Sequence, residues 1–248
     1  DQVEEARALY NAHHCQAIIG FGGGSSMDCA KAVGARLARP NKPLAKMEGI
    51  LKIWHKLPLL IAVPTTAGTG SETTLAAVIT DADTHHKYAI NDFNLIPDYA
   101  VLEPSVTYGL PPQLTATTGM DALTHAIEAY VSTLNGPFTD PLALQAIEMV
   151  LDYLPASYNC NMDAREQMHY AQCLAGMAFS NALLGIVHSM AHKTGAAFST
   201  GHIPHGCANA IYLPYVIQYN AKDSVAAKRY AEIARRMGLE GNSEKALI

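Results

Sequence analysis

Two short apolar runs near the start of the chain each end in a loop rich in glycine, serine and threonine. The first loop, Gly22-Gly23-Gly24-Ser25, leads directly into a helical stretch over residues 27–37. The second loop, residues 65–71, again follows an apolar run. The strand candidates of this region are residues 16–20, 57–63 and 99–102. Short apolar strands that alternate with helices predict a parallel α/β sheet.

The character of the chain changes after residues 110–112, because strand-like runs end there and long amphipathic stretches follow. The expected helices of this second part are residues 120–133, 141–153, 163–179, 181–198, 207–219 and 224–237. We therefore predict an incomplete dinucleotide-binding α/β domain over residues 1–108, followed by an all-helical metal- and substrate-binding domain over residues 109–248.

Charge and cysteine content exclude several classes of protein. The 248 residues carry a formal net charge of -5 and 16% charged side chains, so we expect no nucleic-acid partner. No apolar run approaches the roughly 18 residues of a membrane helix, so no membrane association is expected. Five scattered cysteines without a C-x-x-C pair are typical of reduced thiols, which predicts a cytoplasmic location.

The glycine-rich loops have the composition of an anion-binding site. Backbone N–H groups at a helix N-terminus attract phosphate, and glycines let the backbone approach it closely. The first loop lacks the G-x-G-x-x-G spacing of the ordinary dinucleotide fold, and a tight turn that binds nothing is the alternative. The second loop supplies more hydroxyl groups at the edge of the sheet where ligands of open α/β folds bind. Together the two loops predict a site for a phosphate-bearing cofactor.

Histidines and one aspartate recur at helical spacing in the second part of the chain. Asp121 and His125 lie four residues apart, as do His188 and His192, and His205 follows in a Pro-His-Gly turn. Residues four apart share one face of a helix. A carboxylate with several imidazoles suits a divalent iron, zinc, nickel or copper ion. Each histidine taken singly has the alternative of an ordinary helix or capping residue.

At these residues the chain resembles the iron-containing (group III) alcohol dehydrogenases, which include 1,3-propanediol, lactaldehyde and butanol dehydrogenases. The matching stretches are GGGSSMDCAK (22–31), PTTAGTGSE (64–72), KYAI (87–90), GMDALTHAIEAY (119–130), HSMAHKTGA (188–196) and PHGCANAIYLP (204–214).

The resemblance implies a dehydroquinate synthase-like architecture and a set of site residues. The implied metal ligands are Asp121, His125, His188 and His205. The implied cofactor contacts are Gly23, Gly24, Ser25, Thr65, Thr66, Thr69, Ser71 and Lys87. His192 is the implied catalytic residue, near the nicotinamide and the substrate, where it would relay a proton or position the substrate. The implied cofactors are Fe2+, with Zn2+ also tolerated, and NAD, with NADP not excluded.

Two departures from the family pattern affect these expectations. The interval between His188 and His205 is about three residues longer than in many relatives, so that a strict count would reach His202 instead. The family's N-terminal stretch is missing here, and its C-terminal helices are short. We therefore expect a chain that lacks part of the whole protein.

The predicted function is reversible hydride transfer between a small alcohol or aldehyde and NAD(P), with the metal acting as a Lewis acid on the substrate oxygen. The alternatives are a metal- and NAD-using lyase of the dehydroquinate synthase type, or a catalytically inactive metal-binding fragment. We also expect a homo-oligomer. The residues expected to line an apolar substrate pocket, or to be simple core, are Phe179, Met190 and Phe198.

Overall fold

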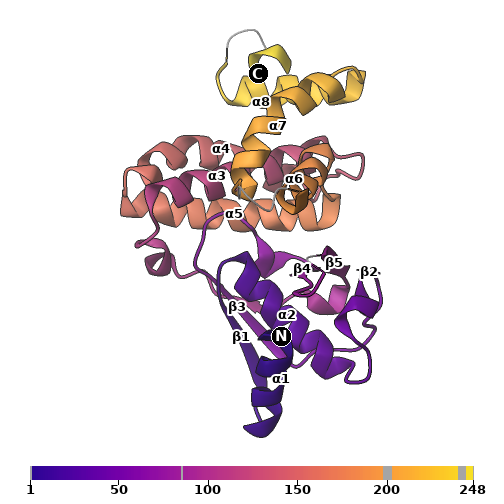
Figure 1. Ribbon diagram of the computed structural model, residues 1–248. Helices are drawn as coiled ribbons and strands as arrows, with labels where there is room; N and C mark the ends of the chain where they lie inside the picture. The colour runs from indigo at the N-terminus through magenta and orange to yellow at the C-terminus, as the bar shows by residue number, and fades with distance from the viewer. Residues whose placement is uncertain (1, 85, 198–202, 240–243, 248) are drawn as a thin grey trace. The chain divides into compact units, whose positions relative to one another are not determined.

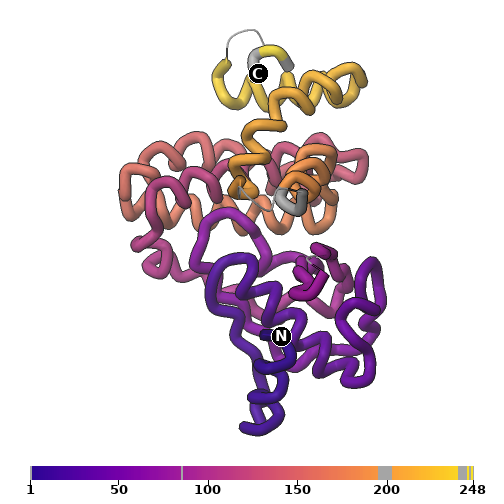
Figure 2. The backbone as a smooth tube through the Cα atoms, in the orientation of Figure 1, coloured from indigo at the N-terminus to yellow at the C-terminus, as the bar shows by residue number. Residues whose placement is uncertain are grey.

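The computed structural model describes residues 2–84, 86–197, 203–239 and 244–247, which form two compact units (Figure 1, Figure 2). Unit 1 comprises Asp1–Thr66 and Ser71–Val106, and unit 2 comprises Ala67–Gly70 and Thr107–Ile248. The second glycine-rich loop is therefore divided between the two units. The assignment of cofactor binding to residues 1–108 and of metal binding to residues 109–248 stays a prediction at this point.

Unit 1 contains two three-stranded sheets among its described residues. The first has the order β1–β3–β6 and is parallel; in the second, β5 pairs parallel with β2 and antiparallel with β4. The strands are β1 (Ala17–Gly22), β2 (Gly49–Ile50), β3 (Leu59–Pro64), β4 (Ala76–Thr80), β5 (Lys87–Asn91) and β6 (Tyr99–Ala100). The helices are α1 (Gln2–Ala12), α2 (Gly24–Ala38) and the short 3-10 turns η1 (Leu44–Met47), η2 (Ser71–Thr73), η3 (Phe93–Leu95) and η4 (Pro104–Thr107).

The predicted parallel sheet is confirmed by β1, β3 and β6. Helix α2 packs closely on it, because a Cβ added to Gly20 would lie 3.1 Å from the Cβ of Ala30. This packing places the N-terminus of α2 directly after the carboxyl end of β1. The second sheet was not predicted, because β2 has only two residues and β5 has a polar residue at each end, and the apolar run of β4 was not recognised as a strand.

The described residues of unit 2 form helices and no strand, which confirms the predicted helical part of the fold. The helices are α3 (Pro112–Val131), α4 (Asp140–Tyr158), α5 (Met162–Ala182), α6 (Ile186–Ala197), α7 (His205–Asn220), α8 (Ser224–Arg236) and the 3-10 turn η5 (Glu244–Leu247). Helix α3 lies at the centre, where it packs against α4, α5 and α7, and every side chain from Asp121 to Tyr130 is buried. Polar groups on this stretch must therefore find partners inside the protein.

Two predicted helix starts are wrong, and the first is that of α3, which was expected from residue 120 and begins at Pro112. A helix was expected over residues 181–198, but α5 continues to Ala182 and α6 begins at Ile186. Leu183 ends α5 with a φ of +63°, and no local preference of leucine for this conformation marks the break in the sequence. No single described helix is long and apolar enough to cross a membrane; only α5 taken together with Ile186–Thr194 passes by length and composition, and the pair is bent by 104°.

Candidate metal centre and cofactor loops

Three of the predicted metal ligands converge inside unit 2. Asp121 and His125 lie one turn apart on α3, and His188 lies in the first turn of α6. The Oδ1 atom of Asp121 is 4.0 Å from Nε2 of His125 and 3.6 Å from Nε2 of His188. One ligand atom from each residue falls within 4.8 Å of the other two, and all three residues are buried. The structure thus brings together side chains that lie up to 67 residues apart in the sequence, at positions 121 and 188.

The fourth predicted ligand, His205, begins α7, and its Nε2 atom is 3.6 Å from Oδ1 of Asp121. It is not a member of the mutually close group of three. The next residue, Gly206, allows α7 to start against α3, because a Cβ there would lie 1.7 Å from the carbonyl oxygen of Thr117. The rival ligand His202 lies outside the described residues.

The predicted catalytic residue His192 lies at the exposed edge of this cluster. Its ring centroid is 4.9 Å from that of His205 in a stacked arrangement and 6.3 Å, edge-on, from that of His188. The side chain therefore lies beside the predicted ligands without joining the buried group. Its catalytic role stays a proposal.

Aromatic stacking holds the imidazole of His125, on α3, in place. The ring of His125 lies between Phe179 and His188, with both pairs of centroids 4.3 Å apart. Phe179 was named as a candidate substrate contact, and in the structure it packs on a predicted ligand. Met190 is 42% exposed, and Phe198 lies outside the described residues.

Burial and mutual contacts shift the pKa values of the residues in this cluster. Burial opposes the ionisation of Asp121, but the neighbouring imidazoles outweigh it and hold the pKa of that carboxyl well below its usual range. Burial lowers the pKa of His125 to about 3, so this imidazole is neutral. Burial also disfavours a charge on His188, but its hydrogen bonds to Asp121 and Glu128 raise its pKa to about 9. Protein groups alone thus place a positive charge beside Asp121.

These residues fit a divalent cation. Metal–ligand bonds of about 2.0–2.2 Å in tetrahedral geometry keep two ligand atoms about 3.3–3.6 Å apart. The observed separations from Asp121 Oδ1 are 3.6, 3.6 and 4.0 Å, so a small inward movement would complete the shell. The donor set of one carboxylate and several imidazoles is one that iron and zinc both accept.

The first glycine-rich loop of unit 1 forms an open turn at the start of α2. Gly22 has a φ of +145°, and Gly23 caps α2 without any side-chain hydrogen bond to the helix. The buried Oγ1 atom of Thr66 has no hydrogen-bond partner among the described residues, and it lies 3.6 Å from the place a Cβ on Gly23 would fill. Ser25 is exposed. A hydroxyl without a partner beside bare backbone fits a phosphate group.

Ser71, predicted as a cofactor contact, is buried and bonded within the protein. Its hydroxyl donates to Asp28 Oδ1 at 2.8 Å and lies 3.1 Å from Nζ of Lys31. Lys31 is fully buried and also donates to the carbonyl oxygens of Ser71, Thr74 and Ala76 at 2.6–2.9 Å. Burial lowers the pKa of Lys31 to about 8. The lysine therefore holds the second loop in its conformation.

The other predicted contacts are distributed over both units. Thr65 continues β3, and its N–H donates to the carbonyl of Gly22 at 2.9 Å. Lys87 begins β5 and is exposed. Thr69 is half-buried in the segment assigned to unit 2, where the next N–H, of Gly70, donates to Gln172 on α5 at 2.8 Å. Whether these residues meet one ligand stays a prediction.

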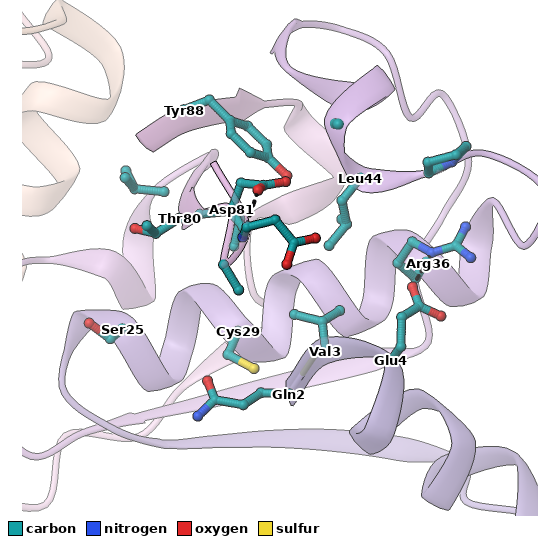
Figure 3. A pocket seen from close by; sticks show the side chains of 16 residues that line it. Gln2, Val3, Glu4, Ser25, Cys29, Arg36, Leu44, Thr80, Asp81 and Tyr88 are labelled. Atoms are coloured by element: carbon teal, nitrogen blue, oxygen red, sulfur yellow. Dashed lines mark hydrogen bonds and ion pairs between the residues drawn. The ribbon is translucent and has the colours of Figure 1, made fainter. Parts of the chain in front are cut away.

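A separate cavity of about 910 Å³ lies within unit 1 (Figure 3). Of the predicted cofactor contacts, Ser25 lines it. Its walls carry the carboxylates of Glu4, Asp81 and Asp83 against the single guanidinium of Arg36, which is already paired with Glu4. An excess of carboxylates repels phosphate, so this cavity does not suit a pyrophosphate.

Two protein-family models match the chain, one in each half. The family model described as "Iron-containing alcohol dehydrogenase" matches residues 1–104, and the one described as "Fe-containing alcohol dehydrogenase family, C-terminal" matches residues 115–247. The chain belongs to the iron-containing alcohol dehydrogenase family. The predicted resemblance and fold are confirmed, and no observation favours the lyase alternative.

Several known oxidoreductases align over almost the whole chain. An NADPH-dependent butanol dehydrogenase of Clostridium saccharobutylicum is 56% identical over 93% of this chain and 59% of its own length. The crystal structure of a 1,3-propanediol oxidoreductase matches 98% of this chain and 64% of its own, with a TM-score of 0.91 and 41% identity. A sulfoacetaldehyde reductase from Bifidobacterium kashiwanohense, in complex with NAD+, matches 99% of this chain and 64% of its own, with a TM-score of 0.86 and 32% identity. The chain thus spans about three fifths of the length of these relatives.

Two buried polar residues inside the matching stretches were given no role by sequence reasoning. Glu128 lies three residues after His125 on α3, and its Oε2 atom is 2.6 Å from Nδ1 of His188. Asn209 on α7 donates from Nδ2 to Oδ1 of Asp121 at 2.7 Å. The available signal was their position one turn from a predicted ligand on a buried helix face, which alone does not say what they contact.

Proposed function

We propose that the protein to which this chain belongs is a metal-dependent alcohol dehydrogenase that transfers a hydride reversibly between a small alcohol or aldehyde and a nicotinamide dinucleotide. The observation that supports this most is the buried group of Asp121, His125 and His188 in a chain of the iron-containing alcohol dehydrogenase family. A structural protein would gain nothing from a carboxylate and two stacked imidazoles in its core, because burying them costs free energy unless they are paired or bound to metal.

The metal-binding residues in this proposal are Asp121, His125, His188 and His205. Fe2+ is the proposed ion, in keeping with the family description, and Zn2+ suits the same donor set. Such an ion polarises the oxygen of a bound alcohol or aldehyde. His192, at the exposed edge of the cluster, would exchange a proton with that oxygen.

The proposed cofactor is NAD or NADP, held by the phosphate-binding turn of unit 1. The hydroxyl of Thr66 and the backbone at Gly23 and Gly24 would receive the pyrophosphate. The relatives support a nicotinamide cofactor by their names, since one is NADPH-dependent and another was crystallised with NAD+. Lys31 would act indirectly by holding the second loop in place.

A small alcohol is the proposed substrate because the names of relatives refer to butanol and 1,3-propanediol. We further propose a cytoplasmic protein that works as a homo-oligomer. The five cysteines are all free in the structure, which agrees with a reducing compartment.

The test is alcohol-dependent reduction of NAD+ and NADP+ by anaerobically purified protein, with metal content measured on the same sample. Asp121→Asn and His188→Ala should lose both bound metal and activity. Full activity in a metal-free variant would refute the proposal. A fluorescence titration with each reduced cofactor distinguishes an active chain from a fragment that binds metal only.

A further inference from the structure

Glu128 on α3 caps a different helix. The residue is 7% exposed, and its carboxylate accepts the backbone N–H groups of Gly185 at 3.1 Å, Val187 at 2.7 Å and His188 at 3.4 Å. These donors lie at the start of α6, where helix N–H groups have no partner within the helix. A carboxylate at this place also interacts favourably with the helix dipole. Glu128 therefore determines where the first turn of α6 lies.

The same carboxylate determines which nitrogen of His188 carries a proton. Oε2 of Glu128 is 2.6 Å from Nδ1 of His188, and an ionised carboxylate can only accept, so Nδ1 must donate. At the opposite side of the ring, Nδ2 of Asn209 lies 3.2 Å from Nε2. Nε2, which lies 3.6 Å from Asp121 Oδ1, is then the ring nitrogen that binds a metal ion, once the ion has displaced any proton on it. The proton on Nδ1 stays with Glu128.

The absence of a side chain at Gly185 leaves room for the carboxylate of Glu128. A Cβ added to Gly185 would lie 2.8 Å from Oε1 of Glu128, closer than side-chain carbons approach other atoms. The oxygen cannot move away freely, because it accepts the N–H of Val187. Gly185 is therefore part of the same arrangement.

We propose that Glu128 is a positioning residue for the metal centre, which holds His188 in the Nδ1–H form and ties the orientation of its ring to the start of α6. This inference rests on the proposed metal site and adds a residue that binds neither metal nor substrate. Outer partners of this kind orient a ligating histidine and raise its basicity.

The experiment measures the affinity of the whole chain for Zn2+ by competition with a chromophoric chelator. Glu128→Gln keeps the shape but replaces one accepting oxygen by an NH2 group, so that His188 and Val187 no longer both find an acceptor. We expect this variant to bind Zn2+ about 10- to 100-fold more weakly than the wild type. Glu166→Gln is the matched control, because Glu166 accepts a hydrogen bond from Tyr170 on α5 and should leave the affinity unchanged.

Proton NMR of the zinc-loaded, 15N-histidine-labelled chain separates positioning from general stability. A strongly downfield Nδ1–H signal is expected in the wild type and in Glu166→Gln, and its loss or upfield shift is expected in Glu128→Gln. If Glu128→Gln does not fold, Gly185→Ala provides the second test, since it displaces the carboxylate without removing its charge. The same weakening of zinc binding is expected from it.

The outcomes distinguish this inference from the proposed function. Failure of the wild-type chain to bind Zn2+ would remove the proposed metal site itself. Wild-type binding with equal affinity in a folded Glu128→Gln or Gly185→Ala variant would overturn the role of Glu128 alone. Weaker binding with an unchanged Nδ1–H signal would likewise overturn it.

Discussion

Substitution of Gly206 by alanine tests whether His205 belongs to the metal site. A Cβ at this position would lie 1.7 Å from the carbonyl oxygen of Thr117 on α3. A close C···O contact needs about 3.3 Å, so the start of α7 must move away from α3 by about 1.6 Å. His205 precedes Gly206 and would move with it. The distance from its Nε2 atom to Asp121 Oδ1 is now 3.6 Å. After the shift this distance would be longer than the separation of about 3.3–3.6 Å between two ligand atoms of one cation.

We expect the Gly206→Ala variant to bind Zn2+ at least about 10- to 100-fold more weakly, since even the loss of an outer partner of a ligand costs that much. Overpacking should also lower its free energy of unfolding by about 1–3 kcal/mol. Chelator competition measures the affinity at a temperature where circular dichroism shows a folded variant. Gly109→Ala is the control, because its Cβ would meet nothing within 4 Å. A folded Gly206→Ala chain with wild-type zinc affinity would show that His205 is not a ligand and would favour His202 as the fourth ligand.

Four further predictions concern stability and the binding of cofactor and metal. Lys31→Met removes the ammonium donor from the carbonyl oxygens of Ser71, Thr74 and Ala76. The first and the last also accept from Thr74, so the main cost, about 1–3 kcal/mol, falls on the carbonyl oxygen of Thr74, and denaturant unfolding would detect it as a lower midpoint. Because the pKa of Lys31 falls from 10.5 to about 8 on folding, the unfolded chain binds more protons between these pH values. The free energy of unfolding of the wild type should therefore rise, relative to that of Lys31→Met, by about 3 kcal/mol from pH 8 to pH 10.5, and a relative fall would contradict this. Thr66→Val removes a hydroxyl that has no partner among the described residues, so thermal stability should stay unchanged while dinucleotide affinity, measured by fluorescence titration, falls about 10-fold. Equal affinity would argue against the phosphate site. Zinc at about 100 times its dissociation constant should raise the free energy of unfolding by about 2.7 kcal/mol over that of chelator-treated protein, and no difference would mean that the fold does not bind it.

Individual helices and strands could be predicted because their side-chain patterns repeat within a few residues. The four-residue spacing of Asp121 and His125 puts both on one face of any helix, and the apolar runs before the two loops form strands β1 and β3. The break between α5 and α6 was missed, since it depends on the conformation of Leu183 and on a cap supplied by Glu128. Neither appears in the periodicity of the chain.

The residue order alone shows that a sheet-forming part precedes a helical part, which family the chain belongs to, and which residue types are available to a metal ion and a phosphate. The folded structure shows which of these groups meet. It placed Glu128 against His188, sixty residues away, and it turned the hydroxyl of Ser71 toward Asp28 and Lys31 inside the protein. The physical reason is that helical and strand periods act over a few residues, whereas a buried polar group takes its partner from whatever element packs beside it.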